Sequence, residues 1–145
     1  MRLAREKTAR VAEAEPGAFV IAADTVVAVG RRVLPKAETP AEARACLDLL
    51  SGRAHRVLTG VAVAAPDGRI AARLSETRLH FKRLTTHEID LYLAGGEWAG
   101  KAGGYGIQGA AGAFVMALQG SYTGVVGLPL YETQSLLTGL GYRPG

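Results

Sequence analysis

The segment Phe19–Val29 restricts the fold of this chain more than any other feature. It is a near-continuous run of apolar residues bounded by Gly30-Arg31, and such runs are typical of strands buried on both faces. Its polar members are Asp24 and Thr25. Burying an ionised carboxylate is costly unless it is paired, hydrogen-bonded or bound to a metal. Asp24 therefore either has a partner inside the fold or lies past the true end of the strand and is solvated, and the sequence leaves both alternatives open.

A helix is predicted at the start of the sequence, over Arg2–Ala14, because the residues there favour helix. Leu3, Lys7, Val11 and Ala14 share one face of this helix. An ammonium group placed between Leu3 and Val11 either extends to water or points at an anion. Lys7 is therefore a candidate anion contact, with solvation as its alternative.

A second helix is predicted up to Leu50, after a short extended piece at residues 33–34. The segment Thr39-Pro40-Ala41-Glu42 combines an N-cap, a proline at the first helical position and the glutamate of a capping box. Cys46 falls on the apolar face of this helix. We expect it to pack as a small core residue and not to act as a nucleophile.

Strands and helices continue to alternate towards the C-terminus. Two apolar runs around the turn Pro66-Asp67-Gly68 predict a long hairpin. A change in apolar parity between Leu74 and Leu79 predicts a bulge in its second strand or a twist that changes faces. The elements predicted in this half of the chain are the hairpin strands Val57–Ala65 and Ile70–Phe81, a helix from the capping box Thr85-Thr86-His87-Glu88 to Gly95-Gly96, a buried strand Ala113–Leu118, and a final helix from Leu128-Pro129 to Gly141.

The order of these elements predicts an α/β fold with helices flanking a twisted sheet. The hairpin strands must be antiparallel, so we expect a mixed sheet and not a wholly parallel one. No internal repeat or low-complexity linker divides the 145 residues. We therefore expect a single domain over residues 1–145.

Composition narrows the class of partner. The net charge of +4 comes from scattered arginines and lysines, which suits small phosphorylated anions better than a nucleic-acid groove. Few aromatic residues accompany the basic ones, so we expect no nucleic-acid partner. A single cysteine excludes an internal disulfide framework, and the sequence has neither a long apolar stretch nor the apolar part of an export signal. We expect a cytoplasmic protein that does not enter membranes.

The segment Glu97–Gly109 is dense in glycine and also carries polar side chains. Its glycines would let backbone N–H groups approach a ligand closely, Lys101 supplies charge, and Gln108 can both donate and accept at a base edge. The spacing does not match a P-loop, and a merely flexible loop is the alternative. Lys36, in a constrained turn after Pro35, can reach a phosphate, although a solvated loop lysine would look the same.

The three histidines do not predict a catalytic or metal site. His55, His80 and His87 lack ligand spacing, and no serine sits in a nucleophile elbow. We expect the histidines to be structural or surface residues, and the identity of any metal ligands stays open.

Four segments, taken in order, resemble the Maf family. They are Ala22-Ala23-Asp24-Thr25-Val26-Val27, Ser51-Gly52-Arg53-Ala54-His55-Arg56-Val57, Lys101-Ala102-Gly103-Gly104-Tyr105-Gly106-Ile107-Gln108-Gly109 and Val125-Val126-Gly127-Leu128-Pro129. This family comprises nucleoside triphosphate pyrophosphatases, also named septum formation inhibitors. The resemblance implies a fold related to inosine triphosphate pyrophosphatases, with a cleft between two lobes of a twisted mixed sheet. It also implies that water attacks the α-phosphorus, which yields a nucleoside monophosphate and pyrophosphate.

The resemblance implies roles for individual residues. By position, Asp24 matches the family's proton acceptor, which would activate the water directly or through a divalent ion. Lys7 and Lys36 match its phosphate-contacting lysines, which would stabilise charge on the triphosphate. Thr25 and Gln108 match positions tied to base selection.

The form of the glycine-rich segment resembles the subgroup that acts on dTTP and UTP. Gln108 can pair with the imide edge of a pyrimidine through complementary donor and acceptor atoms, and Lys101 is a further substrate-binding candidate. Mg²⁺ is the expected ion, with Mn²⁺ as the alternative, because oxygen ligands on phosphate and carboxylate favour hard cations. The resemblance is compatible with a homodimer.

The chain departs from the family pattern in two places. Nothing before Lys7 supplies the family's first strand and its Ser-x-Ser-Pro-Arg-Arg turn, so we expect a domain that is incomplete at its N-terminus. Pro35-Lys36-Ala37 stands where the family usually shows Gly-Lys-Pro. The leading hypothesis is a dTTP and UTP pyrophosphatase, and the alternative is a truncated nucleotide-binding protein that is catalytically weak or silent.

Overall fold

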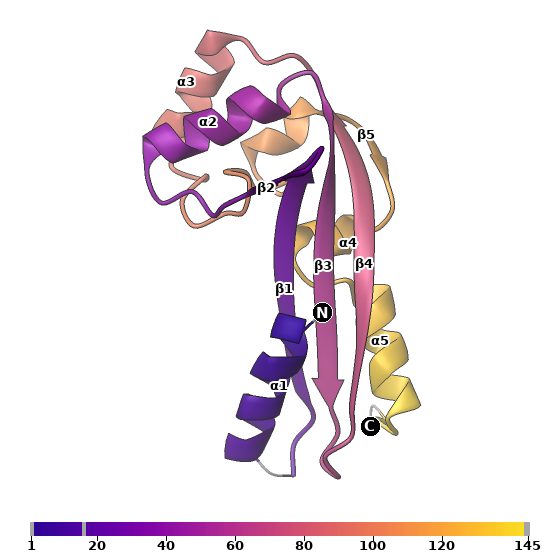
Figure 1. The fold of residues 1–145 in the computed structure, drawn as a ribbon. Coiled ribbons are helices and arrows are strands. Elements are labelled where there is room, and N and C mark those ends of the chain that lie inside the picture. Colours follow the sequence, from indigo (N-terminus) through magenta and orange to yellow (C-terminus); the bar gives the residue numbers. More distant parts are fainter. Residues whose placement is uncertain (1, 16, 144–145) are drawn as a thin grey trace.

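An antiparallel sheet is the frame of the fold (Figure 1). The computed structural model describes residues 2–15 and 17–143, and within them five strands lie in the spatial order β2-β1-β3-β4-β5. The strands are β1 (Val20–Val29), β2 (Arg32–Leu34), β3 (Ala54–Ala64), β4 (Ile70–Phe81) and β5 (Val115–Gln119).

Helices flank this sheet, as the sequence predicts for an α/β fold (Figure 1). They are α1 (Arg2–Ala14), α2 (Pro40–Leu50), α3 (Thr86–Gly95), a 3-10 turn η1 (Ala110–Phe114), α4 (Tyr122–Val126) and α5 (Leu130–Gly139). The short helix α4 was not predicted, because five residues carry too little periodicity to be recognised.

The α/β class is confirmed, but the strand pairing differs from the expected mixed sheet. Every pairing among the described strands is antiparallel. Short turns account for two of these pairings, since a short turn can join only antiparallel neighbours. The turn at Gly30 joins β1 to β2, and residues 65–69 join β3 to β4. The β1–β3 and β4–β5 pairs are antiparallel across longer connections.

The bulge or change of face predicted between Leu74 and Leu79 is wrong, since exposed and buried residues alternate regularly through this part of β4. The β3–β4 register is unbroken from the Ala54–His80 pair to the Ala64–Ile70 pair. Leu74 is half exposed, while polar Ser75 is buried in its place. The apparent change of parity therefore came from an apolar residue on the solvent face. A register shift does occur in β4, but it lies between His80 and Phe81 in the pairing with β5.

The helix α1 packs on the sheet through small residues. Ala4 and Thr8 are fully buried, and Thr8 Oγ1 donates to the Ala62 carbonyl at 3.3 Å. Val11 is 47% exposed, so the predicted apolar stripe is wrong there, and the side chain of Leu3 lies outside the described residues. Small side chains at the contact let the helix axis approach the sheet closely, which a search for large apolar residues does not detect.

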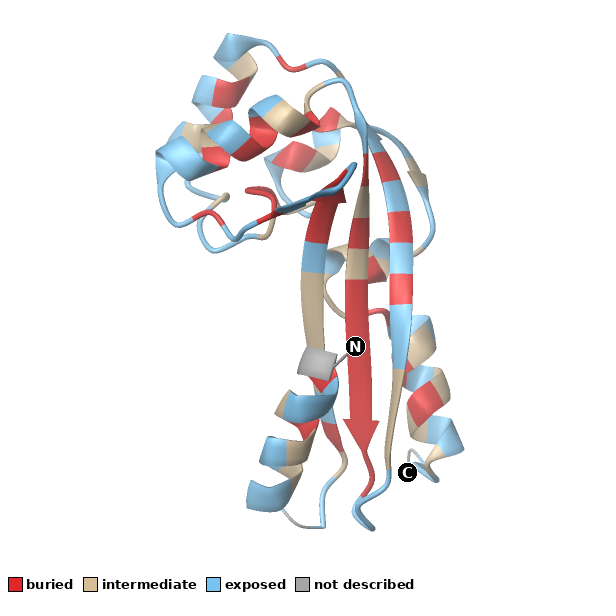
Figure 2. Cartoon of the chain, viewed as in Figure 1, coloured by how far each residue is buried: buried red, intermediate tan, exposed pale blue. Residues whose placement is uncertain are grey.

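Two clusters of buried apolar side chains divide the molecule into two parts. The larger cluster packs α2 and α3 against the end of the sheet where β1 finishes and β3 begins. It includes Cys46, as predicted from its helix face. The smaller cluster packs α5 against Val61 and Val63 of β3. Figure 2 shows β3 buried along most of its length, so this strand connects the two clusters. The long sheet is therefore a shared base on which a cleft can form between them.

Candidate active site

A cleft of about 530 Å³ opens between the two clusters. Its volume is within the usual range of small-molecule sites. Val27 and Val57 belong to the larger cluster, Ala23 packs against the smaller one, and all three line the cleft. The remaining walls come from α1, the segment around Lys36, the glycine-rich segment and α4.

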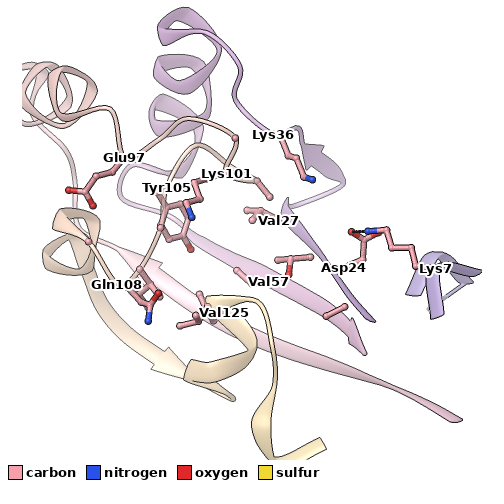
Figure 3. A pocket seen from close by; sticks show the side chains of 18 residues that line it. Lys7, Asp24, Val27, Lys36, Val57, Glu97, Lys101, Tyr105, Gln108 and Val125 are labelled. Carbon is pink, nitrogen blue, oxygen red and sulfur yellow. Dashed lines mark hydrogen bonds and ion pairs between the residues drawn. The ribbon is translucent and has the colours of Figure 1, made fainter. Parts of the chain in front are cut away.

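The structure brings together every side chain that the sequence analysis singled out for a site. All of them line this one cleft: Lys7, Asp24, Thr25, Lys36, Lys101 and Gln108. Figure 3 shows Lys7, Asp24 and Lys36 towards one end of the cleft and Gln108 with Val125 towards the other. The cleft therefore has one charged end and one end where the Gln108 amide lies beside apolar side chains. The role of each residue stays a prediction.

Asp24 lies inside β1, so the alternative that it follows the end of the strand is wrong. Its backbone pairs in register with Gly60 of β3. Lys7 Nζ donates to Asp24 Oδ1 at 3.0 Å, and the Asp24 side chain is 24% exposed (Figure 3). The lysine of α1 is thus the partner that a carboxylate in this strand requires, and the partly exposed Asp24 side chain lines the cleft.

The cleft follows the edge of β1. Among the described residues, β2 pairs only with positions 27–29 of β1, so the part of β1 around Asp24 has a strand neighbour on one side. Successive residues of a strand point to opposite faces. Asp24 points to α1 and Thr25 points to Thr59, yet both line the same cleft. Asp24 and Thr25 therefore reach the cleft from opposite faces of β1.

Thr25 is held from within the sheet. Its Oγ1 lies 3.0 Å from Thr59 Oγ1, and Thr59 Oγ1 donates to the Gly124 carbonyl at 2.7 Å. Sequence reasoning missed Thr59, whose only signal was one hydroxyl in an otherwise apolar strand. It also missed the helix α4 that carries Gly124.

The glycine-rich segment is pinned to the turn that holds Lys36. Lys36 and Ala102 form an antiparallel bridge, and Ala37 N donates to the Lys101 carbonyl at 3.1 Å. Gly103 has a positive φ of 70°, and a Cβ there would lie 3.0 Å from Val27 Cγ1. Only glycine fits this close approach without strain. The alternative of a merely flexible loop is therefore wrong for residues 100–103.

His55 and Tyr105 form a buried pair behind this segment. His55 Nε2 lies 2.6 Å from the Tyr105 hydroxyl, and the rings meet edge to face. Burial, with a smaller effect of neighbouring His80, lowers the pKa of His55 from 6.5 to about 4. The expectation that His55 is a structural residue agrees with this position, and burial also raises the pKa of the Tyr105 phenol.

The lowered pKa of His55 predicts a loss of stability in acid. The unfolded chain binds a proton at His55 below about pH 6.5, whereas the fold accepts it only near pH 4. The contribution of His55 is full above pH 6.5 and falls as the pH drops towards 4, by about 3 kcal/mol in total. Urea unfolding across this range should show a shallower dependence for His55→Gln than for the wild type. The exposed His87→Gln variant is the control, and equal slopes for all three proteins would contradict the prediction.

The charge lining the cleft favours an anionic ligand. Three lysines line it against two carboxylates, Asp24 and Glu97. Glu97 Oε2 accepts from Ala110 N at 3.3 Å. Within residues 2–15 and 17–143, no group of three or more His, Cys, Asp or Glu side chains is placed to form a dedicated metal cage.

No helix in the described parts of the chain combines the length and the apolar character needed to cross a bilayer.

Comparison with known proteins identifies the family. The model of the Maf-like protein family matches residues 1–140. A protein of Caulobacter vibrioides named dTTP/UTP pyrophosphatase is 67% identical over 144 residues, which are 99% of this chain and 75% of that relative. Proteins with the same name from Maricaulis maris and Hyphomonas neptunium are 68% and 64% identical, over 98% and 99% of this chain and 68% and 74% of the relatives. A match over nearly the whole sequence, together with the cleft that gathers the four motifs, shows that this chain belongs to the Maf-like protein family.

Proposed function

We propose that this chain hydrolyses dTTP and UTP to the corresponding monophosphate and pyrophosphate. The observation that carries the proposal is the placement of Asp24, Lys7 and Lys36 at the charged end of the same cleft that holds Gln108. A triphosphate needs cations at one end and a polar base contact at the other. The names of the three relatives support the choice of substrate.

In this mechanism Asp24 is the proton acceptor. Its carboxylate takes a proton from a water molecule, and the water oxygen bonds to the α-phosphorus. The bond from the α-phosphorus to the bridging oxygen breaks, and pyrophosphate leaves with the bond electrons. Lys7 orients the Asp24 carboxylate through its 3.0 Å contact.

Lysine side chains stabilise the charge that this reaction moves onto the leaving group. Lys36 and Lys101 lie on two segments joined by backbone hydrogen bonds, so the bridge between them fixes the spacing of their Cα atoms. Cations whose backbone is held beside the site need less reorganisation when charge develops in the transition state. We assign both lysines to the triphosphate.

A divalent cation fits the donor set of the cleft. Mg²⁺ is commonly bound by one or two carboxylates together with substrate phosphates and water, and Asp24 offers such a carboxylate beside the predicted phosphate position. Mg²⁺, or Mn²⁺ in its place, would neutralise charge on the triphosphate when bound. The proposal also includes a cytoplasmic location, since the substrates are intracellular nucleotides, and it requires neither nucleic acid nor a membrane. The homodimer expected from the family resemblance can be tested by light scattering.

Product analysis tests the proposal. The purified chain is incubated with each standard nucleoside triphosphate and Mg²⁺, and pyrophosphate and orthophosphate are measured separately. We expect one pyrophosphate for each dTTP or UTP consumed, and little turnover of purine nucleotides. Release of orthophosphate alone would contradict the proposed reaction. Binding of UTP by calorimetry without any turnover would support the alternative of a silent nucleotide-binding protein.

A further inference from the structure

A chain of two hydroxyl groups leads from the cleft into the sheet. Thr25 lines the cleft, and its Oγ1 lies 3.0 Å from Oγ1 of Thr59. Thr59 is fully buried and lies 2.7 Å from the carbonyl oxygen of Gly124. Each hydroxyl has a single proton to donate. The donor and acceptor of each hydrogen bond therefore follow from the group at the end of the chain, the Gly124 carbonyl oxygen.

The direction of this chain is determined by the backbone. A carbonyl oxygen can only accept, so the proton of Thr59 is donated to Gly124. Thr59 Oγ1 then has only lone pairs to offer to Thr25, and Thr25 must donate its own proton to Thr59. The Thr25 hydroxyl consequently has no proton left for a ligand and presents only lone pairs to the cleft.

The final acceptor is itself held in place. Gly124 N donates to Ser121 Oγ, the N-cap of α4, at 2.9 Å. A Cβ on Gly124 would lie 2.7 Å from Ser75 Oγ, so α4 approaches the sheet closely only because this residue is glycine. Reversing the proton direction would leave the Gly124 carbonyl without the donor it has inside the fold, which is costly for a buried polar group.

We infer that Thr59 is a positioning residue that fixes the Thr25 hydroxyl as a hydrogen-bond acceptor, and that the ligand group recognised there is a donor, the imide N–H of uracil or thymine. With that proton assigned to Thr25, the Gln108 amide N–H donates to an adjacent carbonyl of the base. The inference rests on the proposed function and specifies how its site selects the base. Cytosine carries a ring nitrogen lone pair where uracil carries the imide N–H. Two sets of lone pairs would then face each other, and the site would reject cytosine without any steric contact.

The size of this discrimination follows from the cost of an unmatched polar pair. Leaving buried polar groups unpaired corresponds to a rate or affinity loss on the order of 10- to 100-fold. We therefore expect kcat/KM for UTP to exceed that for CTP by at least this factor in the wild type. In this assignment Thr25 meets the base and not the reacting phosphorus, so the difference should appear mainly in KM.

Two substitutions at one position test the role of Thr59. Thr59→Val removes the hydroxyl that orients Thr25, and Thr59→Ser keeps it. We expect Thr59→Val to lower the UTP-to-CTP ratio by about tenfold, with kcat for UTP changed less than KM, and Thr59→Ser to retain the wild-type ratio. An unchanged ratio in folded Thr59→Val would overturn the inference. Equal ratios in the serine and valine variants would show a packing role only, which also overturns it.

Modified substrates distinguish the imide from a donor on the sugar. N3-methyl-UTP lacks the imide proton, and 3′-deoxy-UTP lacks a sugar hydroxyl. We expect the first to lose on the order of 10- to 100-fold in kcat/KM and the second to remain near UTP. The reverse result would place the donor on the sugar and overturn the base assignment.

Failure of the inference can be separated from failure of the proposed function. If the wild type releases no pyrophosphate from any nucleotide, the proposed function is wrong. In that case calorimetry measures the affinities of the wild type and both Thr59 variants for UTP and CTP. The ratio of these affinities tests the hydrogen-bond direction without requiring turnover. Equal affinity for UTP and CTP in the wild type would overturn the inference in that case.

Discussion

Asp24→Asn is expected to lower the rate of pyrophosphate release from UTP by about 10² to 10⁴-fold, which is the usual contribution of a positioned general base. The amide is nearly isosteric with the carboxylate, but it cannot take a proton from water. It also lacks the negative charge that pairs with Lys7 Nζ at 3.0 Å. Initial rates at saturating UTP measure the effect on kcat.

Asp48→Asn is the matched control for this substitution. Asp48 is exposed on α2 and does not line the cleft, so its amide variant should keep the wild-type rate. Unfolding curves for both variants verify that the fold is intact. If Asp24→Asn retained full activity, another group would have to activate the water and the assigned role of Asp24 would be wrong.

Lys36→Met is expected to lower kcat/KM for UTP by about 10² to 10³-fold, comparable to the loss of one fixed donor that stabilises a charged transition state. The backbone bridge to Ala102 holds Lys36 at the cleft, so the loss of its charge is not compensated by movement of the turn. Because the cation acts on charge that develops during the reaction, kcat should fall as well as affinity.

Lys82→Met is the control for Lys36→Met. Lys82 forms an ion pair with Glu88 at 2.5 Å and is not among the residues that line the cleft. Its variant should therefore have wild-type kinetics even if it is slightly less stable. A wild-type kcat/KM for Lys36→Met would show that this lysine is a solvated loop residue, which was the alternative left open by the sequence.

Much of the fold could be predicted because its elements carry strong local signals. The apolar run that forms β1 and the turn Pro66-Asp67-Gly68 specify strands without reference to distant residues. The capping box at Thr85 forms reciprocally with Glu88. At Thr39, by contrast, the Glu42 carboxylate accepts from Glu38 N, so only half of that predicted box is present. Local motifs therefore predict where elements begin better than they predict individual hydrogen bonds.

The features that could not be predicted depend on tertiary packing. The buried face of α1 is made of Ala4 and Thr8, which have no distinctive hydrophobic signal. Leu74 is apolar yet faces solvent, and it gave a false change of parity. The antiparallel order of the five described strands depends on which edges meet, and the sequence pattern does not contain that information.

The candidate site also combines residues that the sequence pattern indicates with residues that only the folded structure reveals. Asp24 and Thr25 could be singled out as polar residues in an apolar strand. Local pattern made Lys7 and Lys36 candidates with solvation as the alternative, and the family resemblance supplied their phosphate roles. Thr59 could not be found in either way, since a threonine in a buried strand is ordinary. Its importance depends on the position of the Gly124 carbonyl, which only the folded chain brings to within 2.7 Å.

Hydrolysis of UTP in oxygen-labelled water tests the central claim most directly. Attack of water on the α-phosphorus places the label in the phosphate of the monophosphate and leaves pyrophosphate unlabelled. Mass spectrometry of both products measures this distribution for the wild type, with Asp24→Asn as the low-rate reference. We expect label in the monophosphate alone, and label in pyrophosphate or in orthophosphate would contradict attack at the α-phosphorus.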